Sequence, residues 1–393
     1  MLRPVLLAAA TLALAAAAPP PRGTLLLTEA DLTAIKALNG TSHARIEAIR
    51  VAADKARQQQ PWSVTSHRPE DTPAGLHDFY SEGPYWWPDP KNPRGPYIRR
   101  DGETNPDRFT ANDRDLKNMC DAVLALGAAS WLIDKPEYAR RAAEIVSVWF
   151  LSEDTRMNPS LQFGQAVHGR TTGRPEGLIA TRSFIWLLEG VRLAERSSGW
   201  DPKVSAGLKA WMRDFLHWMT TSEIGRGEGG SGNNHASWWT AQGSAMAIYI
   251  GDHGARDRMF EHYRSTLLKQ FQPDGSAPRE EARTKSLSYS MFNALALSMT
   301  ARMAQVQGKD IANYANRDGV GLHVVARYLA PFLTSPTTWT NPQITKFEAD
   351  KEHFAGLAGL ALNKPELLRA QRKLGVAGGT AADLLSLLFE VTW

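Results

Sequence analysis

The amino-acid sequence predicts an all-α protein, and within that class an α/α toroid, an incomplete barrel of helical hairpins whose long loops form a cleft. Strand signals are scarce, and apolar residues recur with the helical period along most of the chain. Consecutive helices pair into hairpins of roughly 40 to 50 residues that lack the signatures of known helical repeats. A solenoid would also pair helices in this way. Long loops that carry Trp, His, Arg and Asn favour the toroid, where loops at one end build a site.

The composition supports one folded core and excludes several classes of protein. Of the 393 residues, 43% are hydrophobic, and the 13 Trp and 13 Phe exclude general disorder. Cys120 is the single cysteine, which excludes a disulfide scaffold and a zinc–cysteine site. The net charge of +4 is too small for a nucleic-acid-binding protein but suits a polyanionic ligand. The ten His are scattered without an HExxH motif, so we expect neither a metal nor another cofactor.

The first residues have the pattern of a secretory signal peptide. A basic start with Arg3 precedes the apolar run 5–18, which is too short to span a bilayer and is followed by three prolines. We therefore expect removal of residues 1–22, with an approximate cleavage position. Residues 23–393 are expected to form one domain, because no Pro/Ser-rich linker divides them. The protein is then predicted to be periplasmic and free of the membrane.

Caps and apolar periodicity define the expected helices in chain order. Thr28 is suited to cap the first helix, and Leu116 and Cys120 fall on the apolar side of a longer one. Pro136 and Pro202 occupy first-turn positions, where the missing N–H leaves no hydrogen bond unmade. We expect helices over residues 29–37, 43–59, 113–133, 136–151, 176–197, 202–221, 234–250, 256–271, 286–305 and 319–333, and short ones over 353–362, 365–373 and 381–390.

Three irregular segments interrupt these helices. Residues 61–110 are rich in Pro, Gly and aromatic residues and show neither the helical nor the strand periodicity of apolar residues. Irregular segments of that length are usually functional. Residues 158–175 and the Gly-rich residues 225–232 are expected to be loops. In the first segment, Tyr85, Trp86 and Trp87 can stack on sugar rings. The same aromatic side chains could instead close one end of the core.

Polar side chains near these loops are candidates for binding and catalysis. His77 opens the aromatic stretch, and Gln165, a neutral donor suited to a carboxylate, precedes His168 in the second segment. Asn234 follows the Gly-rich run and places His235 in the first turn of the next helix, where the helix dipole favours anions. No Gly-Lys-Ser/Thr follows, so this run is not a phosphate loop. Each of these residues alone could equally be a structural polar group.

A fourth group surrounds Tyr289. Arg283 and Lys285 precede this tyrosine and could hold its phenol partly ionised, although a charged loop leading into a helix gives the same pattern. Glu280 and Glu281 are neighbours, and neighbouring side chains on a helix point apart, so they are a poor acid/base pair for glycoside hydrolysis.

The four segments, in this order, resemble the alginate lyase superfamily with its α/α toroid, including polysaccharide lyase family 5 and related polyuronate lyases such as family 38. The resemblance runs from about His77 to Asn293, and Trp86-Trp87 is closer to the family 38 branch. It implies a catalytic tyrosine, an Asn-His pair, a carboxylate-neutralising glutamine and an active-site arginine. These roles are implied for Tyr289, Asn234, His235, Gln165 and Arg283, with Arg279 and Arg283 as rivals for the arginine.

The implied reaction is β-elimination in a 4-linked polyuronate, which leaves an unsaturated uronate end. Removal of H5 creates an enediolate, and Gln165, Asn234, His235 and Arg283 would neutralise its carboxylate. In mannuronate and glucuronate, H5 and O4 lie on one side of the ring, so Tyr289 could act as both base and acid. In guluronate they lie on opposite faces, and His235 would be the base.

We therefore expect a lyase acting on an anionic polysaccharide, alginate and in particular polymannuronate. A glucuronan lyase of the same mechanism is the nearest alternative, because glucuronate and mannuronate differ only at C2. An α/α-toroid glycoside hydrolase would need two facing carboxylates, for which Asp78, Glu82 and Glu281 are candidates. A non-catalytic periplasmic protein that stacks sugars on Trp86 and Trp87 is the third possibility.

Overall fold

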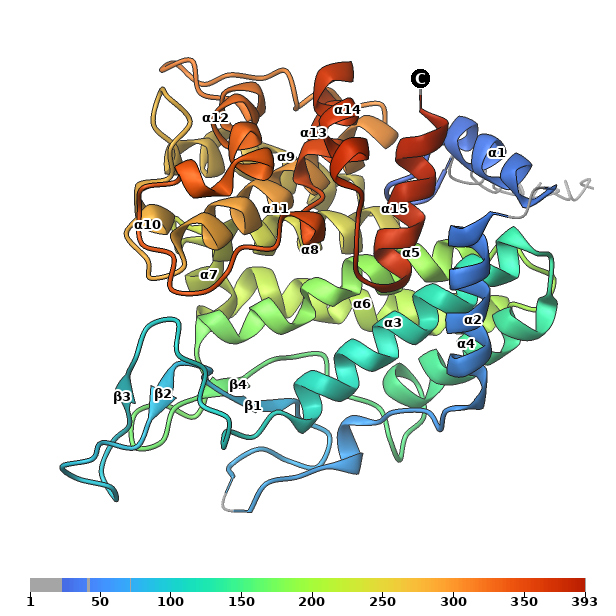
Figure 1. The fold of residues 1–393 in the computed structure, drawn as a ribbon. Helices are drawn as coiled ribbons and strands as arrows, with labels where there is room; N and C mark the ends of the chain where they lie inside the picture. The colour runs from blue at the N-terminus through green and yellow to red at the C-terminus, as the bar shows by residue number, and fades with distance from the viewer. Residues whose placement is uncertain (1–22, 41–42, 71, 393) are drawn as a thin grey trace, which may run out of the picture.

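The computed structural model describes residues 23–40, 43–70 and 72–392 and is mostly helical (Figure 1), which confirms the predicted all-α class. The predicted signal peptide, residues 1–22, lies outside the described residues. The α-helices are α1 (Glu29–Ala37), α2 (Ala44–Gln58), α3 (Ala111–Leu132), α4 (Pro136–Phe150), α5 (Phe184–Ala194), α6 (Pro202–Thr221), α7 (Glu223–Gly229), α8 (Asn234–Ile250), α9 (His253–Ser265), α10 (Pro278–Glu281), α11 (Ser286–Val306), α12 (Leu322–Thr334), α13 (Phe354–Leu362), α14 (Pro365–Leu374) and α15 (Gly379–Val391).

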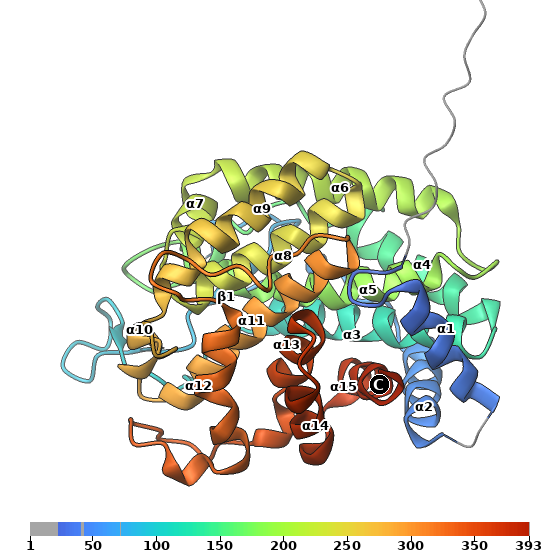
Figure 2. The same cartoon turned by 90° about the horizontal axis from the view of Figure 1, so that it is seen from above.

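The contacts between the helices form a closed series. Figure 2 shows these helices turned by 90° from the view of Figure 1. Helices α3, α5, α8, α11 and α13 contact one another in that order, and α14 and α15 continue from α13 to α2, which packs on α3. Helices α4, α6, α9 and α12 pack against members of this series. Pairing of consecutive helices thus gives the barrel-like arrangement that the sequence predicts.

Small residues allow the central helices to approach closely. A Cβ atom on Gly127 of α3 would lie 2.0 Å from the carbonyl oxygen of Gly190 on α5, so the two backbones touch where both residues lack side chains. Helix α8 is buried on nearly all sides, and its hydroxyl groups are satisfied internally, as where Thr240 donates to the carbonyl of Ala236. A helix that is buried all round belongs to the core.

Buried charged groups fix the start of the described chain to the core. The fully buried carboxylate of Glu189 accepts hydrogen bonds from the Thr24 hydroxyl and from the backbone N–H groups of Leu25 and Leu26. Arg302 donates to the carbonyl of Leu26 and forms an ion pair with Asp31. Thr28 caps α1 with a complete capping box, as the sequence indicates.

The long aromatic segment forms short strands that the sequence did not predict. Strands β2 (Trp86–Trp87) and β3 (Ile98–Arg99) form an antiparallel pair, called the aromatic hairpin below (residues 83–105). Strand β1 (Tyr80–Glu82) runs parallel to β4 (Phe163–Ala166), which brings the first and second irregular segments together. In Figure 1 these strands lie below the helical ring at its left side.

Two expected boundaries were wrong for identifiable reasons. The Gly-rich residues 225–232 were expected to be a loop, but α7 occupies residues up to Gly229. Gly225 serves close packing rather than a turn, because a Cβ there would lie 2.0 Å from the carbonyl oxygen of Met219. The helix expected at 176–197 begins as a 3-10 helix, Pro175–Ser183, and becomes α-helical only in α5. None of the helices in the described ranges has both the length and the apolar character needed to cross a membrane.

Substitution of Gly127 by Ala is expected to destabilise the protein by about 1–3 kcal/mol, because the added methyl group forces α3 and α5 apart. Gly254→Ala in α9 is the matched control, since the nearest atoms would lie 3.4 Å from its Cβ, an ordinary contact distance. Better helix propensity should leave the control as stable as the wild type or more stable, by up to about 1 kcal/mol. Thermal unfolding followed by circular dichroism measures both, and equal stabilities of the two variants would contradict the packing argument.

Candidate active site

Residues from five separate segments line one cavity of about 630 Å³. The cavity lies among the aromatic hairpin, β4, the 3-10 helix and the N-terminal ends of α8 and α11. All five residues with implied catalytic roles contribute to it. Its walls are formed by Pro84, Tyr85, Trp86, Arg99, Gln165, Arg174, Glu176, Ile179, Arg182, Asn233, Asn234, His235, Arg283, Tyr289 and Phe292.

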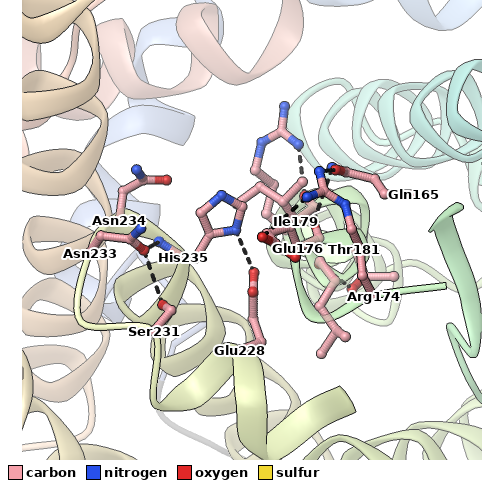
Figure 3. A network of polar contacts seen from close by, with 12 residues as sticks. Gln165, Arg174, Glu176, Ile179, Thr181, Glu228, Ser231, Asn233, Asn234 and His235 are labelled. Atoms are coloured by element: carbon pink, nitrogen blue, oxygen red, sulfur yellow. Dashed lines mark hydrogen bonds and ion pairs between the residues drawn. The ribbon is translucent and has the colours of Figure 1, made fainter. Parts of the chain in front are cut away.

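His235 is held by a carboxylate that sequence reasoning missed. Asn233 caps α8 by accepting from the N–H of His235, which places the imidazole in the first turn. The Nδ1 atom lies 2.7 Å from Oε1 of Glu228, a side chain on α7 that is 1% exposed (Figure 3). Burial raises the pKa of Glu228, and the neighbouring imidazole opposes that rise. With Nδ1 engaged, Nε2 is the ring nitrogen left for a ligand.

Asn234 is oriented by a second buried carboxylate, Glu280. Its side-chain Nδ2 lies 3.0 and 2.9 Å from the two carboxylate oxygens of Glu280, and its backbone N–H donates to the same group. Both residues are almost fully buried. One amide N–H directed between the two oxygens satisfies both distances, which leaves the second N–H and Oδ1 of Asn234 to face the cavity.

Gln165 is fixed in an unusual backbone conformation next to an arginine. Its φ of 51° is in the left-handed region, and its backbone N–H donates to Ser81. The side-chain Nε2 donates to the carbonyl of Glu176, and Oε1 accepts from Arg174 at 2.5 Å (Figure 3). Arg174 also forms an ion pair with the Glu176 carboxylate at 3.2 Å. The side-chain amide of Gln165, which lines the cavity, is therefore polarised by the guanidinium of Arg174.

Arg283 and Tyr289 contact each other and are both attached to the aromatic hairpin. The guanidinium lies 4.1 Å from the centre of the Tyr289 ring and forms a two-pronged ion pair with Asp101, the shortest distance being 2.7 Å. The Tyr289 hydroxyl lies 2.6 Å from that of Tyr85. Among the candidate residues, these two thus have partners that come from the hairpin.

The surroundings of Tyr289 favour the neutral phenol and do not support the possibility that Arg283 and Lys285 hold it partly ionised. Burial and the hydrogen bond with Tyr85 raise its pKa well above the ordinary value, and Arg283 only partly opposes this. The charge of Arg283 is balanced by Asp101, which weakens its effect on the phenol. Lys285 does not line the cavity, and its backbone instead pairs with Gln343.

Several predicted substrate contacts lie elsewhere. Trp86 lines the cavity, whereas Trp87, the next residue on the strand, points to the other face and donates to the carbonyl of Glu103. Arg279 donates to the carbonyl of Ser231, so Arg283 is the arginine of the two that reaches the cavity. The Nδ1 atom of His77 is hydrogen-bonded to the carbonyl oxygen of Arg156 at 2.7 Å, and His77 is not part of the cavity wall.

His168 packs against Tyr97 at the exposed rim of the loops and is likewise absent from the cavity wall. Sequence reasoning missed Arg99, Arg174, Glu176 and Arg182 in the wall. It also missed Asp101 and Glu228, which contact Arg283 and His235, and it considered Glu280 only as a carboxylate beside Glu281 and not as the partner of Asn234. Arg174 follows Gln165 in the same irregular segment, and this was the available signal for it. No group of three or more His, Cys, Asp or Glu that could hold a metal occurs in the described part of the chain.

The sequence matches the family described as Alginate lyase over residues 63–339, which is most of the chain. The protein belongs to the alginate lyase family. This confirms the predicted family, whose members are polysaccharide lyases. A search of the curated proteins finds no match.

Solved structures of alginate lyases share the fold of this family member. The crystal structure of an alginate lyase from Bacteroides ovatus has 30% sequence identity and a TM-score of 0.86, covering 93% of this chain and 98% of that chain. Alginate lyase A1-III from Sphingomonas species A1 has 18% identity and a TM-score of 0.58, covering 92% and 90% of the two chains. A histidine-to-alanine variant of A1-III complexed with a tetrasaccharide has 17% identity and a TM-score of 0.59, covering 91% of each chain. The α/α toroid is thereby confirmed.

The Asp101–Arg283 pair should stabilise this member of the alginate lyase family in a pH-dependent way. Burial raises the pKa of Asp101, but hydrogen bonds from Arg283 and Thr284 outweigh it and lower the pKa from 3.8 to about 2. A carboxyl group whose pKa is lowered by folding stabilises the fold at pH values above its ordinary pKa. This stabilisation is lost as the pH falls toward about 2. Asp101→Asn should therefore lower the melting temperature near neutral pH. The difference in melting temperature between the variant and the wild type should become smaller below about pH 4. Thermal scans of both proteins over this range test it, and a difference that does not change with pH would contradict the assignment.

Proposed function

We propose that this protein cleaves a 4-linked polyuronate by β-elimination, with alginate and in particular polymannuronate as the substrate. The convergence of Gln165, Asn234, His235, Arg283 and Tyr289 on one cavity carries this proposal. These side chains supply uncharged and cationic donors for a carboxylate together with a phenol for proton transfer. That combination suits abstraction of a proton next to a carboxylate.

The donors would act on the carboxylate at C5 of the bound sugar. Loss of H5 moves negative charge onto the carboxylate oxygens, and donors already oriented toward them stabilise that charge without reorganising. Arg283 and the Arg174–Gln165 pair supply positive charge or polarised N–H groups. Asn234 and His235 stand at the N-terminus of α8, where the helix dipole also favours an anion.

Tyr289 is the proposed acid and base for substrates whose H5 and O4 lie on the same side. As a phenolate it removes H5 and becomes a phenol, and it then gives this proton to O4 as the C4–O bond breaks, so the phenolate returns. Tyr85 can donate to the phenolate across the 2.6 Å hydrogen bond, and Arg283 faces the ring. Because the resting pKa is raised, the reactive phenolate is a minor species, and the rate should increase with pH until another group limits it.

The other readings of the sequence are less well supported. A hydrolase would require paired carboxylates, but Asp78, Glu82 and Glu281 do not line the cavity and accept hydrogen bonds from protein groups instead. Glucuronan remains the alternative substrate. The five candidate residues would act around C4 to C6 of the sugar, so we do not expect them to distinguish glucuronate from mannuronate, which differ at C2. Guluronate would require His235 as the base, with Tyr289 as the acid.

Polymannuronate, polyguluronate and glucuronan should be incubated with the protein and followed by the ultraviolet absorbance of the unsaturated product. We expect absorbance to rise fastest with polymannuronate. New reducing ends without absorbance would indicate hydrolysis, and binding without any product would indicate a sugar-binding protein. Either result on every polyuronate would overturn the proposed function.

Tyr289→Phe is expected to lower kcat by at least about 100-fold, because the ring remains while the proton-transferring hydroxyl is lost. Tyr314→Phe is the matched control, since Tyr314 is 41% exposed and is not part of the cavity wall. Circular dichroism should show that both variants are folded. A Tyr289→Phe enzyme with wild-type turnover would refute the assignment of the acid and base.

Arg283→Ala and Arg279→Ala compare two arginines four positions apart. We expect the first variant to lose at least about tenfold in kcat/KM, because it removes a cation from the cavity, whereas the second should stay within about twofold. Initial rates on polymannuronate measure both. Equal losses in the two variants would show that the effect comes from general charge and not from the cavity.

A further inference from the structure

Glu228 is a deeply buried acidic group in direct contact with the candidate catalytic side chain of His235. It is 1% exposed, and its Oε1 atom lies 2.7 Å from Nδ1 of His235, which is 18% exposed on the cavity side. Its second oxygen, Oε2, is buried and has no hydrogen-bond partner within the described residues. An unsatisfied buried carboxylate oxygen is costly, so packing alone does not account for a glutamate here.

We propose that Glu228 is a positioning residue that fixes the ring orientation and the proton of His235, so that Nε2 is presented to the substrate in a defined state. This inference rests on the proposed lyase function. The local fold supports it, because α7 places Glu228 seven residues before His235 and Asn233 fixes the start of α8 between them. Asn233 therefore fixes the backbone of His235, and Glu228 fixes the imidazole through Nδ1.

The protons of the pair decide what Nε2 can do. When the pair holds its extra proton, either an imidazolium faces a carboxylate or a neutral imidazole accepts from a carboxylic acid, and in both forms Nε2–H donates toward the cavity. Such a donor suits the carboxylate of a bound uronate. When the extra proton is lost, Nδ1–H still donates to Glu228 and Nε2 becomes an acceptor, which is the state of a base.

Other charged groups around the pair have mixed signs. Glu176 on the 3-10 helix disfavours a charge on Glu228, whereas Arg174 at the start of that helix favours it (Figure 3). Glu280 on α10 interacts electrostatically with His235 and with Arg283, and both favour the charged form of its carboxylate. Because these outer charges partly cancel, the contact at 2.7 Å should dominate the behaviour of His235.

Three variants of the full-length protein test the role of Glu228. Glu228→Gln keeps the shape but removes the negative charge, and Glu228→Asp keeps the charge at a greater distance. Glu189→Gln is the control for loss of a buried carboxylate, since Glu189 binds Thr24 and the adjacent backbone far from the cavity. All three are compared by thermal unfolding, by kcat and KM on polymannuronate, and by NMR of histidine N–H protons without substrate.

We expect Glu228→Gln to lower kcat about tenfold or more with a smaller change in KM, and to remove a downfield imidazole N–H resonance that the wild type shows. Glu228→Asp should restore part of kcat and of the resonance. Glu189→Gln should lower thermal stability but keep the resonance and the kcat of the folded enzyme.

Wild-type kcat and an unchanged histidine resonance in Glu228→Gln would overturn the proposal. So would a loss of kcat in Glu189→Gln as large as that in Glu228→Gln, because the effect would then reflect stability alone. Failure of the proposed function looks different: the wild type itself would give no unsaturated product, while the NMR comparison would still report on the Glu228–His235 contact.

Discussion

Carboxylates that hold the groups facing the cavity, two of them buried and one partly buried, are the constraint on which this site depends. Glu228 holds His235, Glu280 holds Asn234, and Asp101 holds Arg283. Each acid comes from a different element than the residue it orients, so the site forms only when the helices and the hairpin have packed. Side chains fixed in this way lose little entropy when a substrate binds, which is the basis of preorganised catalysis.

The same acids also control the charge of the cavity. Four arginines line it, and unpaired they would favour any anion and repel one another. Pairing of Arg283 with Asp101, and of Arg174 with Glu176, leaves N–H groups directed at fixed positions in place of a diffuse positive field. A uronate carboxylate can share these donors when it enters. Recognition then depends on where the carboxylate lies, and net charge is a secondary factor.

Sequence reasoning predicted the helical ring and the five candidate catalytic residues, but it predicted the surrounding groups poorly. Helix periodicity and caps are local signals, which explains the success with α1, α6 and α8. Local signals gave Gln165 and Tyr289 only as candidates with an equal structural explanation, and the family resemblance supplied their implied roles. Glu228 was missed because its Gly-rich surroundings suggest a loop, whereas those glycines serve close contacts with Met219 and Trp239. Asp101 was missed because its partner Arg283 lies 182 positions away.

The Tyr85–Tyr289 hydrogen bond joins the aromatic hairpin to the side chain that we propose for proton transfer. The two hydroxyl groups lie 2.6 Å apart and either can be the donor, so Tyr289 holds its proton more firmly when Tyr85 accepts than when Tyr85 donates. Tyr85 is on the same hairpin as Trp86, which lines the cavity, and as Asp101, which holds Arg283. A sugar ring that contacts Trp86 therefore touches the element that sets both the cation and the phenol. In the proposed mechanism, binding of the sugar and activation of Tyr289 would both act through this one short segment.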